Sequence, residues 1–178
     1  KSTLLLQLAL TLAASNKKIL YVSGEESVEQ VKMRAERITP QRKTKTEYDS
    51  LLLLSQTDTD AIVGQIEEIQ PDLVIIDSIQ TIESQNVSGL SGSVGQIRYS
   101  ALQFVRSAKR NNIPVIIVGH VTKEGMVAGP MVLSHMVDTV LFLEGEKFAK
   151  TRILRSLKNR FGPVDEVGIF VMEGEGML

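Results

Sequence analysis

Hydrophobic and polar positions along the chain follow two alternating periods. Leu and Ala fill residues 4–14, a composition that favours a helix, and apolar residues recur at helical spacing over 28–38. Ser27 and Gln30 form a capping-box pattern in front of the second of these segments. Helical spacing recurs around Ile62, Ile66 and Ile69, ending before Pro71, and again over about 94–111.

Short runs of β-branched and aliphatic residues separate these helices. Four of them are expected to be strands, at 19–22, 51–54, 73–77 and 115–118. Further strands are expected at 138–143, 151–157 and 167–172, the last two forming a hairpin across 158–166. Polar residues 39–50 predict a loop, and the Ser/Gly-rich residues 84–95 predict a mobile one. The alternation predicts an α/β fold with a largely parallel central sheet flanked by helices.

Composition narrows the class of protein. The chain has 178 residues, 43% of them hydrophobic, which suits one core over 1–178 and no second domain. Its net charge of −1 excludes a globally basic nucleic-acid binder, so any DNA site must be local. The absence of cysteine excludes a disulfide scaffold or a thiolate zinc site and suits a cytoplasmic protein. No apolar run reaches the roughly 18 residues that a membrane span needs.

The chain opens on Lys1, Ser2 and Thr3, followed by the apolar segment 4–14. In the pattern Gly-x-x-x-x-Gly-Lys-Ser/Thr, backbone N–H groups cradle phosphates, the lysine reaches the β- and γ-phosphates and the hydroxyl binds Mg²⁺. Only the tail of that pattern is present, and by itself such a tripeptide is equally an ordinary chain terminus. With no initiator Met and no signal-peptide pattern, the chain is expected to be a fragment that begins inside the motif.

Acidic residues and a histidine follow the predicted strands. Asp77 ends the apolar run 73–77, as expected of a Mg²⁺-binding acid, although a turn or helix-capping Asp would look the same. Glu25 follows the strand at 19–22 and is the preferred base for activating water, leaving Glu26 to favour the next helix through its dipole. His120, after the strand at 115–118, is a candidate sensor of the γ-phosphate.

A basic run occupies residues 147–160, which contain six lysines and arginines and no acid. Lys158 and Arg160 lie two residues apart in it, so an extended segment would present both on one side. They are expected to reach the nucleotide of a neighbouring subunit. The alternatives are that they grip DNA phosphate, or that the run is a solvated strand pair.

Four segments of the chain resemble a known family, the bacterial RadA (Sms) ATPase domain. They are YVSGEES at 21–27, GHVTKEG at 119–125, HMVDTVL at 135–141 and KNRFG at 158–162, the last being the most specific. The resemblance implies a RecA-like P-loop fold related to the DnaB-type helicases, in a hexameric ring with ATP bound between subunits. It also implies an ATP- and Mg²⁺-dependent motor acting on single-stranded and branched DNA, alongside a recombinase filament, in recombination and repair.

The same resemblance assigns roles to individual residues. Lys1, Ser2 and Thr3 serve phosphate and Mg²⁺, with Asp77 as the second magnesium-side residue; Glu25 activates water and His120 is the sensor. The loops at 84–95 and 121–130 match DNA-facing positions, with Lys123 and Arg98 the expected DNA contacts.

The sequence departs from the family pattern in three places. The zinc module, the protease-like domain and the glycines before Lys1 are absent, so the fragment itself is expected to bind nucleotide poorly. Two rival functions stay open at this point. One is a replicative helicase or another RecA-type motor, and the other is a catalytically inactive assembly or DNA-binding module.

Overall fold

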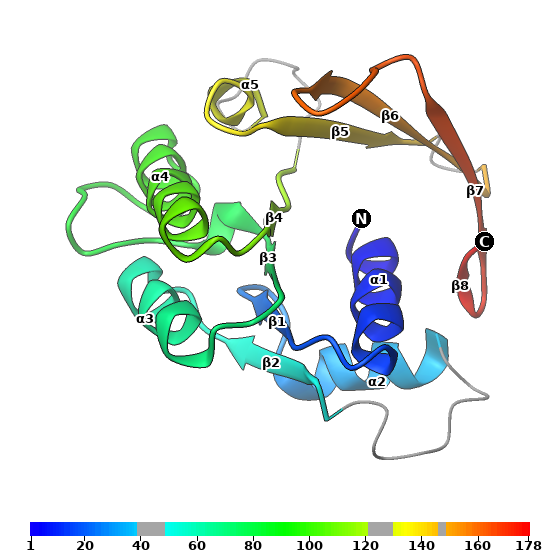
Figure 1. The fold of residues 1–178 in the computed structure, drawn as a ribbon, viewed down its shortest axis with the longest axis horizontal. Helices are drawn as coiled ribbons and strands as arrows, with labels where there is room; N and C mark the ends of the chain where they lie inside the picture. The colour runs from blue at the N-terminus through cyan, green and yellow to red at the C-terminus, as the bar shows by residue number, and fades with distance from the viewer. Residues whose placement is uncertain (39–48, 121–129, 146–148) are drawn as a thin grey trace.

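The computed structural model describes residues 1–38, 49–120, 130–145 and 149–178. Two four-stranded sheets and the helices around them make up the described part of the chain (Figure 1). The helices are α1 (Ser2–Ala14), α2 (Val28–Ile38), α3 (Thr59–Ile69), the 3₁₀ turn η2 (Ile79–Thr81), α4 (Val94–Asn111) and α5 (Pro130–Ser134). The strands are β1 (Ile19–Ser23), β2 (Leu51–Ser55), β3 (Leu73–Asp77), β4 (Val115–Ile117), β5 (Thr139–Glu144), β6 (Thr151–Asn159), β7 (Val167–Glu173) and β8 (Gly176–Met177).

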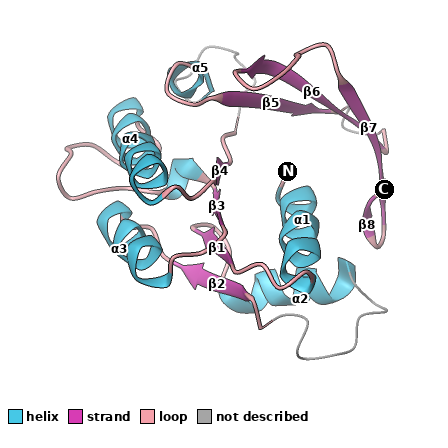
Figure 2. Cartoon of the chain, viewed as in Figure 1, coloured by secondary structure: helices cyan, strands magenta, loops and turns pink. Residues whose placement is uncertain are grey.

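The first sheet is parallel, in the order β2-β1-β3-β4. Helices α1 and α2 lie on one side of it, and α3 and α4 lie on the other (Figures 1 and 2). Every residue of β1 and β3 is buried, because alternate side chains enter two different cores. Tyr21 and Ile75 pack with α1 and α2, whereas Val22 and Ile76 pack with α3 and α4. The predicted parallel α/β core is confirmed.

The second sheet is antiparallel, in the order β5-β6-β7-β8, with a register shift between Val140 and Leu141. Its last strand is tied to α1, since Gln7 Nε2 donates to Met177 O at 3.0 Å and Gln7 Oε1 accepts from Met177 N at 2.8 Å. The expected C-terminal hairpin is confirmed as β6 and β7. The start of its connection was predicted too early, because β6 continues through Asn159 and therefore contains Lys158.

The Ser/Gly-rich segment before α4 is more ordered at its start than its composition predicts. Gln96, which is buried, accepts from Ser84 N at 2.9 Å and donates to the carbonyls of Ser84, Val87 and Gly89. Residues 84–89 are thus held against the first turn of α4 by one amide side chain. The loop sequence itself does not predict this order, because the side chain that provides it belongs to the helix.

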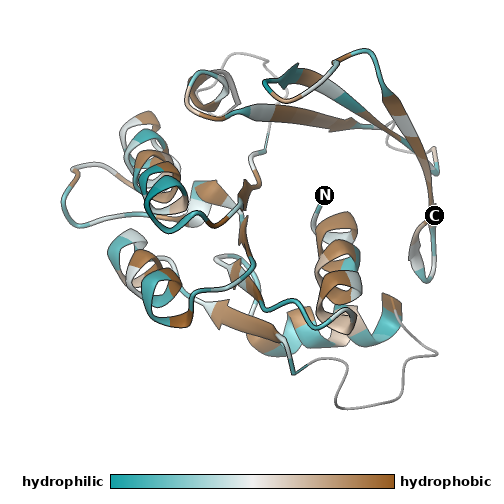
Figure 3. Cartoon of the chain, viewed as in Figure 1, coloured by the Kyte–Doolittle hydropathy of each residue, from teal (hydrophilic) through white to brown (hydrophobic). Residues whose placement is uncertain are grey.

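No helix in the four described stretches is long and apolar enough to cross a membrane. Hydrophobic residues concentrate in the strands of the parallel sheet and in the helices packed against it (Figure 3).

Candidate functional site

Residues from α1, β1, α2 and β3 meet at the carboxyl edge of the parallel sheet. Strands β1 and β3 are in register at their last residues, so that Ser23 lies beside Asp77. Gly24 N then donates to Asp77 O at 3.0 Å, which holds the two strand ends together. A small cavity of about 90 Å³ opens there, lined by Ser2, Ser23, Glu25, Glu26, Arg34 and Asp77.

Asp77 is buried at the floor of this edge, 8% exposed. Its Oδ2 accepts a 2.6 Å hydrogen bond from Tyr21 Oη. Burial, and secondarily the charge of Asp77, raises the pKa of the Tyr21 hydroxyl far above its ordinary value. Tyr21 therefore stays protonated and donates to the carboxylate, which fixes one oxygen of Asp77 while the residue still lines the cavity.

Glu25 and Glu26 are neighbours in sequence with different partners. Glu25 Oε1 accepts from Ser78 Oγ at 2.5 Å and lies 3.7 Å from His120 Nε2. The Glu26 carboxylate pairs with Arg34 of α2. The backbone of Glu26 is held by Ser23, whose Oγ donates to Glu26 O and accepts from Glu26 N. Both Glu25 and His120 are about half exposed, at 49% each, so a small molecule can reach them.

The close packing behind Glu25 depends on Gly24. A Cβ built on Gly24 would lie 2.1 Å from Thr81 Oγ1 of η2, far inside contact distance. Thr81 Oγ1 in turn donates to Ser78 O at 2.9 Å. The absence of a side chain at residue 24 therefore lets the end of β1 approach the turn that carries Ser78.

Lys1 precedes α1 and reaches across to the end of another strand. Its Nζ donates to Gly119 O at 2.5 Å, beyond β4. Partial burial lowers the pKa of the Lys1 ammonium, while the nearby charge of Asp77 opposes that shift. Ser2, the first residue of α1, lines the cavity, and Thr3 does not.

Lys158 and Arg160 have partners within the chain. Lys158 Nζ donates to Ser134 O and Val137 O, both at 2.7 Å, and so caps the end of α5. Arg160 pairs with Asp138 at 2.8 Å, and its side chain is 54% exposed. Both side chains thus have partners within the chain, although Arg160 retains much of its exposure.

The two residues expected to contact DNA are not alike in the structure. Arg98 is exposed, near the start of α4. Lys123 lies outside the described residues, as does Lys147 of the basic run. Arg98 is not among the residues that line the cavity at Asp77.

The donor set at the cavity fits Mg²⁺ held together with a phosphate. The described residues contain no group of three or more His, Cys, Asp or Glu that would form a cage for a metal. Mg²⁺ commonly takes only one or two carboxylates and completes its shell with water and phosphate oxygens. Asp77 and the Ser2 hydroxyl, which line one cavity, would be its protein-side oxygen ligands.

Sequence patterns did not identify Tyr21 or Arg34 as parts of this site. The only signal at Tyr21 is a hydroxyl inside an otherwise apolar strand, which needs a partner once buried. Arg34 gives a weaker signal, because it belongs to an amphipathic helix whose other charges face solvent. Its partner Glu26 lies two residues before that helix begins.

The chain is similar to known proteins over its whole length. It is 49% identical to the DNA repair protein RadA of Listeria monocytogenes and 50% identical to that of Streptococcus pneumoniae, over 100% of the chain in both cases. It spans about two fifths of those relatives, 38% and 41%. A solved structure of the RadB recombinase, 22% identical, shares the fold with a TM-score of 0.68, covering 99% of this chain and 84% of that one. The family model described as AAA domain matches residues 1–126, and the chain therefore belongs to the AAA domain family.

Proposed function

We propose that the chain is the ATP-hydrolysing motor domain of a DNA repair and recombination protein. One observation carries the proposal. Ser2, Glu25 and Asp77 line a single cavity beside Lys1, at the sheet edge where α/β proteins bind nucleotides. The similarity to proteins named DNA repair protein RadA supports the repair role.

The side chains suit hydrolysis of a phosphoanhydride. Lys1 would exchange Gly119 O for a phosphate oxygen of ATP, since its Nζ has no other partner among the described residues. Bound Mg²⁺ would offset phosphate charge at Ser2 and Asp77. Glu25, oriented by Ser78, would take a proton from the attacking water. The water oxygen would bond to the terminal phosphorus as the bond from phosphorus to the leaving oxygen of ADP breaks. His120, near Glu25, would sense the terminal phosphate.

The work done by hydrolysis is proposed to be movement along single-stranded and branched DNA beside a recombinase filament. A hexameric ring would bring the exposed Arg160 to the nucleotide of a neighbour, and Arg98 and Lys123 would contact DNA phosphates. Arg160 suits an external anion better than Lys158, whose ammonium already serves two carbonyls.

The test is Lys1→Ala in the full product of the gene, assayed for ATP hydrolysis with and without single-stranded DNA. Hydrolysis should be abolished while the melting temperature is kept, because Lys1 belongs to neither hydrophobic core. Lys17→Ala is the matched control, since Lys17 is exposed beyond the opposite end of α1 and pairs with Asp72. Parental hydrolysis by the Lys1 variant would contradict the role of Lys1 at the phosphate, and no hydrolysis by the parent would favour an inactive assembly instead.

A further inference from the structure

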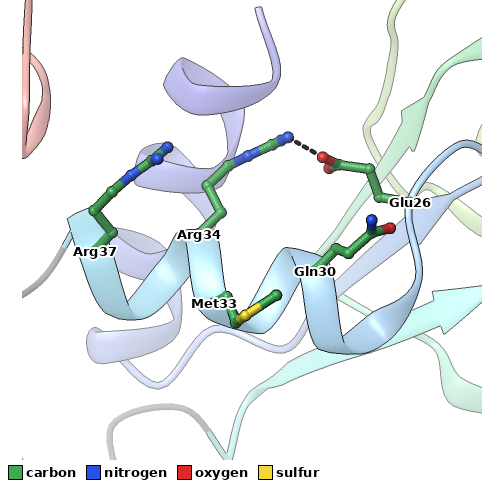
Figure 4. A pocket seen from close by; sticks show the side chains of 5 residues that line it. All are labelled: Glu26, Gln30, Met33, Arg34 and Arg37. Atoms are coloured by element: carbon green, nitrogen blue, oxygen red, sulfur yellow. Dashed lines mark hydrogen bonds and ion pairs between the residues drawn. The ribbon is translucent and has the colours of Figure 1, made fainter.

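One nitrogen of Arg34 is buried without a partner. Its Nη2 pairs with the Glu26 carboxylate, which Figure 4 shows as a dashed line from α2. Its Nη1 has almost no exposed surface and no hydrogen-bond acceptor within the described residues. A buried N–H of a charged group that lacks an acceptor is unfavourable, so this nitrogen marks a place where an acceptor belongs.

Arg34 lies between two hollows of the surface. One is a pocket of about 370 Å³ along α2, where Gln30, Met33 and Arg37 are its neighbours (Figure 4). The other is the cavity of about 90 Å³ that also contains Ser2, Glu25 and Asp77. The guanidinium is thus the one cationic side chain among the residues lining the cavity where the phosphate of ATP is proposed to sit.

The lining of that cavity limits what the acceptor can be. Its three carboxylates already have donors, from Ser78 to Glu25, from Arg34 to Glu26 and from Tyr21 to Asp77. A free anion would meet their combined negative charge. A phosphate that enters beside Lys1 and Ser2 together with a bound cation would have its negative charge partly neutralised. The guanidinium of Arg34 can then donate to Glu26 and to a phosphate oxygen at the same time.

We propose that Arg34 binds an oxygen of the terminal phosphate of ATP through Nη1, from within the same subunit. The terminal phosphate is chosen because Glu25, the proposed base, lines the same cavity, so the reacting end of the nucleotide lies there. This inference rests on the proposed function. It adds a binding residue in cis, on a helix far in sequence from Arg160.

The test compares two nucleotides on the full product of the gene. Arg34→Ala should weaken binding of a non-hydrolysable ATP analogue by about tenfold or more, the worth of one charge-assisted hydrogen bond, and ADP binding by less than about twofold. Arg37→Ala, on the same helix, should bind both as the parent does. If Arg34→Ala does not fold, Arg34→Lys gives the same readout, because it keeps a charge near Glu26 without the fork.

Glu26→Gln separates binding from positioning. If Arg34 binds phosphate, this variant keeps the parental ratio of the two affinities; if Arg34 only holds Glu26, it reproduces the loss seen in Arg34→Ala and overturns the inference. Equal weakening of both nucleotides by Arg34→Ala, or no weakening of either, overturns it too. A parent that binds neither nucleotide contradicts the proposed function itself, a result distinct from the others.

Discussion

The two sheets of this chain use hydrophobic residues in opposite ways. In the parallel sheet all residues of β1 and β3 are buried, because helices cover both faces. In the antiparallel sheet β7 alternates between half-buried and exposed residues, and Ile169 is 69% exposed. Leu157 of β6 is similarly open, at 62%.

The parallel sheet is therefore the rigid part of the molecule, whereas the antiparallel sheet exposes side chains that another molecule could contact. Packing on both faces fixes the ends of β1 and β3, so the groups beyond them at the carboxyl edge are held before any ligand arrives. The antiparallel sheet exposes apolar side chains such as Ile169 and Leu157, and Arg155 and Arg160 stay about half exposed although each pairs with a carboxylate. Glu25 and Asp77 lie at the first sheet, and Arg160, the candidate for contact with a neighbouring subunit, follows β6 of the second.

The largest expected effect is at Arg160, the candidate for contact with a neighbouring subunit. Arg160→Ala should lower DNA-dependent ATP hydrolysis by about 10³-fold or more if Arg160 acts on a neighbour's nucleotide. Subunits lacking Lys1 and subunits lacking Arg160 should each be inactive alone, and mixed rings should recover activity where an intact Lys1 faces an intact Arg160. Hydrolysis is measured across mixing ratios.

An opposite pattern would move Arg160 to the DNA side. That pattern is parental ATP hydrolysis with lost DNA binding in Arg160→Ala, and no recovery in rings shown to be mixed. Lys158→Ala is a poor substitute for this test, because removing its ammonium leaves the carbonyls of Ser134 and Val137 without that donor.

The comparison of the sheets is tested directly by one substitution made in both. Ile76→Ala in β3 should cost about 2–5 kcal/mol of unfolding free energy, because the side chain is fully buried and leaves a cavity. Ile169→Ala in β7 should cost less than about 0.5 kcal/mol in the isolated chain. Urea denaturation of the two variants measures both values, and similar losses would contradict the division.

The sequence predicted the central sheet well because burial on both faces leaves a plain signal. Residues 73–77 are an unbroken apolar run closed by an acid, and the structure has the strand at Leu73–Asp77. Since parallel strands end at one edge, the meeting of Glu25 and Asp77 also followed from their places after strands.

Contacts between distant side chains could not be predicted in the same way. The bond from Tyr21 to Asp77 requires the register of β1 on β3, and the pair of Arg34 with Glu26 requires the angle of α2 to its strand. Periodicity fixes neither quantity. The partners of Lys158 could not be predicted either, because its acceptors are backbone carbonyls, which a sequence does not display.

A smaller effect is expected at Gly24, where the end of β1 packs closely against η2. Gly24→Ala should destabilise the chain by about 1–3 kcal/mol and lower ATP hydrolysis, because its Cβ would meet Thr81 Oγ1 and push Ser78 from Glu25. Thr81→Ala combined with Gly24→Ala should recover part of the stability by removing that oxygen. If the double variant is no more stable than Gly24→Ala, the contact with Thr81 is not the cause.

At the sheet edge, the smallest effect is expected at Tyr21, and it depends on pH. Tyr21→Phe should cost only about 1 kcal/mol at neutral pH, because Asp77 borders the cavity, where water can replace the lost hydroxyl. The pKa of Tyr21 is raised in the folded state, first by burial and then by the charge of Asp77. Its contribution to stability is therefore fully present below the ordinary tyrosine pKa of about 10 and is lost as the pH rises above it.

Urea denaturation between about pH 9 and pH 11 would show this difference. Above pH 10 the unfolded parent loses the Tyr21 proton and the folded parent keeps it, so the parent should lose up to about 1.4 kcal/mol per pH unit that Tyr21→Phe does not lose. The two stability curves should converge as the pH rises, since the variant has no hydroxyl to ionise. Curves that stay parallel would mean that Tyr21 ionises as readily when folded as when unfolded. The hydroxyl would then not be held against Asp77, and the floor of the proposed phosphate site would be looser than the rest of the sheet edge.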